Sequence, residues 1–117
     1  MLQSFRTGKN EEKELSGMLQ NGLMTITLEY CAAWNYTARA VRVTEQILAE
    51  REIEYFVKDW KLIPSSGGRF EVTVNDELVF SKKALGRHAE EGEVRSAILK
   101  VLDTLRPPDF KFPKDDD

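Results

Sequence analysis

The sequence lacks most of the features that assign a chain to a specialised class of protein. It has a single cysteine and a single histidine, which rules out an internal disulfide and a zinc site built from Cys and His. No apolar run approaches the roughly 20 residues that span a bilayer. The formal net charge of −3 leaves no excess of Lys and Arg for nucleic acid. We therefore expect no metal or cofactor, no membrane segment and no nucleic-acid partner.

What is present is the composition of one globular domain. The chain has 117 residues, of which 41% are apolar and 32% charged, enough for one two-layer core. A free thiol suits a reducing compartment, and residues 1–17 lack the apolar core of a secretory signal, so we expect a cytoplasmic protein. Composition predicts a flexible N-terminal tail over 1–22, a folded domain over 23–106 and a Pro- and Asp-rich C-terminal tail over 107–117.

Hydrophobic periodicity in the central region predicts the order β-α-β-β-β-α. The expected strands are 23–30, 52–58, 69–75 and 78–82, and the expected helices are 35–50 and 91–105. The segments "KLIPSSGG" and "KKALGRHAEEG" are expected as loops, and Asn75-Asp76 as a tight hairpin turn. A right-handed crossover makes the first two strands parallel, and the hairpin adds two antiparallel strands. This pattern predicts a thioredoxin-like α/β two-layer sandwich with a mixed four-stranded sheet.

Cys31 is the candidate nucleophile, because it ends the first predicted strand just before the first predicted helix. Helix N-termini carry free N–H groups and partial positive charge, which stabilise a thiolate. The alternative is a small buried apolar cysteine without a role in chemistry. Trp34, three residues later, either covers an edge of the core or shields the thiol. If Cys31 is exposed, oxidation is expected to join two chains through it.

Three segments resemble the selenoprotein W/T/H-like (Rdx) family, and the resemblance covers about residues 23–105. They are "EYCAAWNY" from Glu29, "GGRFEV" from Gly67 and "LVFSK" from Leu78. In that family the first strand ends in Cys-x-x-Cys or Cys-x-x-selenocysteine, usually followed by an aromatic residue two positions on. Cys31 matches the first cysteine and Tyr36 the aromatic residue, whereas Trp34 occupies the second redox position. The resemblance implies a thioredoxin-like fold and thiol redox work with glutathione or thioredoxin-type partners.

Two functions are consistent with these residues. The first is a monothiol redox role in cell redox homeostasis, with Cys31 as nucleophile and glutathione or a protein thiol as the external partner. The second is a non-catalytic adaptor that keeps the fold as a protein-binding surface around Trp34. The residues expected to form the binding surface are Tyr36, Ser65, Ser66, Gly67, Gly68 and Phe70.

Overall fold

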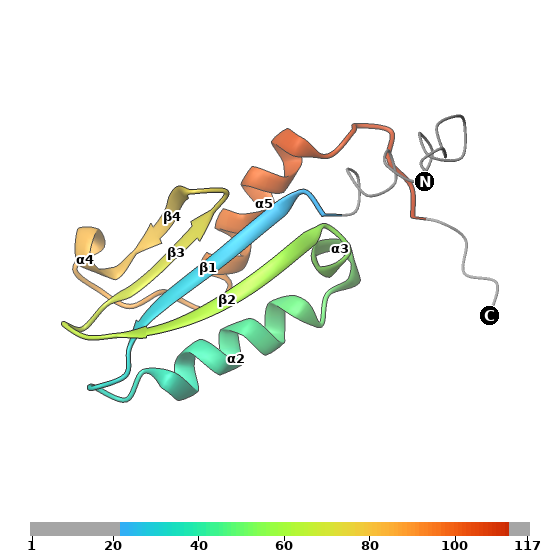
Figure 1. The fold of residues 1–117 in the computed structure, drawn as a ribbon. Helices are drawn as coiled ribbons and strands as arrows, with labels where there is room; N and C mark the ends of the chain where they lie inside the picture. The colour runs from blue at the N-terminus through green and yellow to red at the C-terminus, as the bar shows by residue number, and fades with distance from the viewer. Residues whose placement is uncertain (1–21, 113–117) are drawn as a thin grey trace, which may run out of the picture.

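The computed structural model describes residues 22–112, which form a single four-stranded mixed sheet with helices (Figure 1). The strands are β1 Met24–Cys31, β2 Val57–Ser65, β3 Phe70–Val74 and β4 Glu77–Ser81, and the helices are α2 Thr37–Leu48, α3 Arg51–Glu54, α4 Lys82–Leu85 and α5 Glu93–Leu105. The strand order is β2-β1-β3-β4, with β1 parallel to β2 and antiparallel to β3, and β3 antiparallel to β4. The predicted thioredoxin-like arrangement is confirmed.

The core lies between the helices and one face of the sheet. Along β1 the alternate residues Met24, Ile26 and Leu28 are fully buried, while the residues between them are only partly covered. This period of two is the signature of a strand with one face against a core. Residues from both long helices join the same cluster, namely Ala40 and Ile47 of α2 and Val94, Ile98 and Leu102 of α5. The domain is therefore built of two layers.

The second strand is not where the sequence pattern predicted it. Residues 51–54 form the short helix α3, and β2 begins only at Val57. The alternation of apolar residues at Ile53, Tyr55 and Val57 was misleading, because Ile53 and Phe56 are the fully buried pair and lie three residues apart, as in a helical turn. The "KLIPS" part of the expected loop belongs to β2. Pro64 is tolerated there because β2 is an edge strand.

The β3–β4 hairpin has the predicted tight turn. Asn75 and Asp76 adopt φ angles of 51° and 70°, as a two-residue type I′ turn requires. The Asn75 side chain also accepts a hydrogen bond from the Thr25 amide at 2.9 Å and donates one to the Leu23 carbonyl at 3.0 Å. A side chain of the turn thus ties the hairpin to the start of β1.

The segment after β4 contains the short helix α4, where the sequence pattern predicted only loop. The Ser81 hydroxyl accepts a hydrogen bond from the Ala84 amide at 2.9 Å, and Gly86 ends the helix with a left-handed φ of 73°. These are the usual N-terminal and C-terminal caps of a helix. With only four residues between the two caps, the segment has no periodicity that a sequence pattern reveals.

The described chain continues past α5 through residues 107–112, which belong to the expected C-terminal tail. Phe110 and Phe112 pack against Tyr55 and Phe56, with Phe110–Phe56 and Phe112–Tyr55 ring centroids 4.9 and 5.4 Å apart. This aromatic cluster joins residues 110–112 to the residues that follow α3. The expected N-terminal tail lies almost wholly outside the described residues. Within them, no helix is long and apolar enough to span a membrane.

Candidate functional site

Cys31 is the last residue of β1 and has no exposed surface. Its amide donates a hydrogen bond to the Arg69 carbonyl at 2.8 Å, which fixes the end of β1 against the start of β3. A turn over residues 32–35 follows, and α2 begins only at Thr37. The cysteine therefore ends the strand, as predicted, but the helix starts six residues later.

The polar contact of the thiol comes from the turn. The Trp34 amide donates a hydrogen bond to Cys31 Sγ at 3.3 Å. The turn itself is closed by Asn35, whose φ of 63° lies in the left-handed region that Asn tolerates. The turn thus directs the backbone N–H group of Trp34 at the sulfur.

The Trp34 side chain lies across the neighbouring turn between β2 and β3. A methyl group added to Gly68 would come within 2.7 Å of Trp34 Cζ3, so the indole ring packs directly on the glycine backbone. Gly67 and Gly68 have φ angles of 76° and 72°, which L-residues rarely adopt. The ring is nevertheless 62% exposed. Trp34 therefore forms a surface contact between the two turns, and its ring also meets the Tyr36 ring edge-on with centroids 6.4 Å apart.

The residues predicted to bind a partner lie at the same end of the sheet but differ in exposure. Ser66 and Gly67 are exposed beside Trp34, whereas Ser65 ends β2 in register with Cys31. Phe70 is fully buried, so it supports this end from within the core instead of presenting a surface.

Tyr36, which is half buried, packs edge-on against a residue that the sequence pattern did not single out. The Tyr36 and His88 ring centroids are 4.7 Å apart, and Lys82 Nζ lies 5.7 Å from the Tyr36 ring centroid. Burial lowers the pKa of His88, and the positive charges of Arg39 and Lys82 lower it further. His88 is therefore held towards its neutral form. Its Nδ1 atom is buried without a partner among the described residues.

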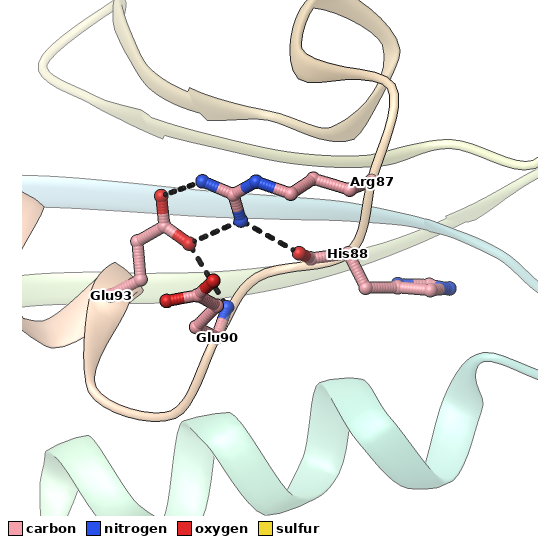
Figure 2. A network of polar contacts seen from close by, with 4 residues as sticks. All are labelled: Arg87, His88, Glu90 and Glu93. Carbon is pink, nitrogen blue, oxygen red and sulfur yellow. Dashed lines mark hydrogen bonds and ion pairs between the residues drawn. The ribbon is translucent and has the colours of Figure 1, made fainter.

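The loop that carries His88 is fixed by a polar network at the start of α5 (Figure 2). Arg87 contacts both carboxylate oxygens of Glu93, at 2.8 and 2.9 Å, and the Glu90 amide donates to the same carboxylate at 2.9 Å. The Arg87 hydrogen bond, followed by that of the Glu90 amide, lowers the pKa of Glu93 to about 2. The His88 ring points away from this network (Figure 2). It is this ring that packs edge-on against Tyr36.

The chemistry of this end of the sheet rests on one sulfur. Cys31 is a free thiol. No group of three or more His, Cys, Asp or Glu side chains suited to a metal ion occurs in residues 22–112. The site therefore offers a thiol with an amide donor, an exposed indole and an aromatic–histidine contact.

The chain is similar to known proteins in sequence and in structure. The family model described as Rdx family matches residues 25–100. No curated protein matches the chain. The crystal structure of a selenoprotein W-related protein from Vibrio cholerae is similar, with 22% identity, a TM-score of 0.62 and coverage of 68% of this chain and 98% of that one. A crystal structure from Bordetella parapertussis has 18% identity, a TM-score of 0.61 and coverage of 67% and 96%. These two likenesses establish the fold.

Proposed function

The chain belongs to the Rdx family, and from this premise we propose that it is a single-thiol redox protein in which Cys31 is the nucleophile. The observation that carries the proposal is the hydrogen bond from the Trp34 amide to Cys31 Sγ at 3.3 Å. It provides a fixed donor for the thiolate at the spacing where dithiol oxidoreductases keep their second sulfur. Because Trp34 replaces that sulfur, the resolving thiol comes from another molecule.

The exchange proceeds in two steps with glutathione as the external thiol. The Cys31 thiolate attacks the glutathione sulfur of a glutathionylated protein, forms a mixed disulfide at Cys31 and releases the protein thiolate. A second glutathione thiolate attacks the glutathione sulfur of this mixed disulfide. Oxidised glutathione leaves and the Cys31 thiolate is restored. The substrate protein is reduced to its thiol, and its glutathionyl group leaves joined to one free glutathione as oxidised glutathione.

Trp34 controls access to the sulfur in this mechanism. Cys31 has no exposed surface, so a disulfide reaches it only after the turn over residues 32–35 opens. Trp34 is 62% exposed, and its ring contacts the Gly68 backbone and the edge of the Tyr36 ring. Moving the ring away requires much less free energy than unfolding the domain. We therefore expect the thiol to react only in conformations in which this turn is locally open.

The test is the rate at which oxidised glutathione forms a mixed disulfide with the native protein, followed by mass spectrometry. We expect the wild type to be modified at Cys31 under conditions where the domain stays folded, and Trp34→Ala to be modified faster. Gly67→Ala is the matched control, because it strains a neighbouring backbone position without contacting Trp34. A rate equal to that of global unfolding, in both the wild type and Trp34→Ala, refutes the proposal.

A protein-binding adaptor is the second candidate, and one observation favours it. The thiol is buried while the indole of Trp34 is exposed, beside the exposed Ser66 and Gly67. Exposed tryptophans are frequent anchors of protein interfaces. On this hypothesis Trp34→Ala abolishes partner binding and Cys31→Ser has no effect. Under the redox proposal Cys31→Ser abolishes the activity and Trp34→Ala increases thiol reactivity, so the two variants separate the functions.

A further inference from the structure

Within residues 22–112, strand β2 forms one edge of the sheet and β4 forms the other (Figure 1). It is nine residues long, and the Ser65 carbonyl faces inwards to accept a hydrogen bond from the Ala32 amide at 2.9 Å. Backbone groups alternate between the two sides of a strand, so those of Leu62 and Trp60 point away from β1. Such outward N–H and C=O groups form a template for pairing with another strand.

The side chains of β2 also present apolar surface at this edge. Leu62 is 38% exposed and Ile63 is 41% exposed. As successive residues of a strand they lie on opposite faces of the sheet. The other edge is less suited to pairing, because β4 has only five residues and its register with β3 is interrupted. The exposed edge of β2 thus provides apolar contacts on both faces.

Two of the three charged residues of β2 determine which strand fits against it. Asp59 and Lys61 lie two residues apart and therefore share one face. When two β2 strands pair antiparallel about Trp60, Asp59 of each copy faces Lys61 of the other. Pairing about Lys61 would instead place two lysines opposite one another. Neither residue has an ion pair within residues 22–112, and Asp59 Oδ1 is buried there without a hydrogen-bond partner.

We propose that β2 is the interface of a homodimer, in which two copies of the chain pair their β2 strands antiparallel about Trp60. The two four-stranded sheets then form one continuous sheet. The Asp59–Lys61 pairs form twice, once on each side of the two-fold axis. Pro64, which lacks an N–H group, lies towards the end of the strand, where it limits pairing with longer or shifted partners.

This dimer has a consequence for the thiols. Cys31 is in register with Ser65, which lies five residues from the proposed axis at Trp60. The two Cys31 residues are then at opposite ends of the interface. The rise per residue of a strand places them roughly 30 Å from one another. The dimer therefore needs no disulfide and leaves each thiol site separate. It persists in reducing buffer and in Cys31→Ser.

The test is a charge swap followed by sedimentation equilibrium over a range of protein concentrations. We expect the wild type to dimerise, and Asp59→Lys or Lys61→Asp to raise the dissociation constant by roughly tenfold, because both cross-strand pairs become like-charged. The double variant carrying both substitutions restores the pairs with reversed sign and recovers dimerisation. As a control, Lys100→Asp makes the same charge change as Lys61→Asp, but on the exposed surface of α5, and we expect it to leave the dimer intact.

The proposal is overturned if the wild type stays monomeric up to about 1 mM, where even weak specific dimers assemble, or if the double variant is as monomeric as the single ones. Amide hydrogen exchange gives a readout that needs no variant. The Trp60 and Leu62 amides face outwards in the monomer, so they exchange slowly only when a second strand covers them. We expect their protection to rise with protein concentration. Protection that is independent of concentration contradicts a β2–β2 interface.

Discussion

Gly68→Ala tests the contact between Trp34 and the β2–β3 turn, with Gly67→Ala as its matched control. Both glycines have left-handed φ angles, and alanine in that region costs roughly 1–2 kcal/mol. At Gly67 the new methyl group meets only Arg69 Nη1 at 3.6 Å, an ordinary contact distance. At Gly68 it would lie 2.7 Å from Trp34 Cζ3, so the ring has to move by about 1 Å or leave the turn.

The size of the additional effect follows from the exposure of the ring. Trp34 is 62% exposed, so the remaining part of its surface, about 100 Å², contributes roughly 2 kcal/mol at most. Gly68→Ala should therefore lower the free energy of unfolding by up to about 2 kcal/mol more than Gly67→Ala. In urea denaturation this difference should vanish in a Trp34→Ala background, where no ring is left to displace.

The same variants report on access to the thiol. Alkylation of Cys31 in the folded protein should be faster in Gly68→Ala than in Gly67→Ala, because only the former displaces the indole. In the Trp34→Ala background the two glycine variants should react at the same rate. Equal rates in the presence of Trp34 would refute the reasoning that the ring controls access.

Three further substitutions follow from the structure. Trp34→Cys should form a reversible disulfide with Cys31, because the backbone of residue 34 already contacts Sγ, and a folded variant in which mass spectrometry finds no disulfide would contradict the geometry. Phe112→Ala should lower the free energy of unfolding by roughly 2 kcal/mol through loss of its aromatic contacts, whereas Lys111→Ala on the exposed neighbour should not. Arg87→Gln should have a lower free energy of unfolding than the wild type near neutral pH. This difference should shrink as the pH falls from 4.5 towards about 2, because Glu93, whose pKa is lowered to about 2, stabilises the fold only while its carboxylate is charged. An equal difference in free energy of unfolding at pH 6 and pH 2, measured by urea denaturation, would contradict the role given to the Arg87–Glu93 pair.

The sequence predicted those elements whose side chains alternate strictly. In β1 the buried residues Met24, Ile26 and Leu28 are separated by polar ones, and the Asn75-Asp76 turn has a strong local preference. Strand β2 was placed wrongly because it is an edge strand whose sequence, "VKDWKLIPS", has no clear alternation. Its position depends on pairing with β1, which is a long-range contact.

The candidate site was only partly predictable for the same reason. The alternation of apolar residues along β1 predicts that Cys31 lies at the end of the strand. Its complete burial depends on the surrounding turns. The contact of His88 with Tyr36 joins residues 52 positions apart, and no local spacing indicates it. The packing of Trp34 on Gly68 likewise needs the β2–β3 turn to lie beside the end of β1.

The most direct test of the redox proposal is the formation of a mixed disulfide at Cys31 in the native protein. The folded wild type is incubated with oxidised glutathione, and its modification rate is compared with its rate of global unfolding. We predict modification at Cys31 faster than global unfolding, further acceleration in Trp34→Ala, and full reversal by reduced glutathione. Modification that never exceeds the unfolding rate, with or without Trp34, would show that Cys31 is a buried structural residue and contradict the proposed redox role.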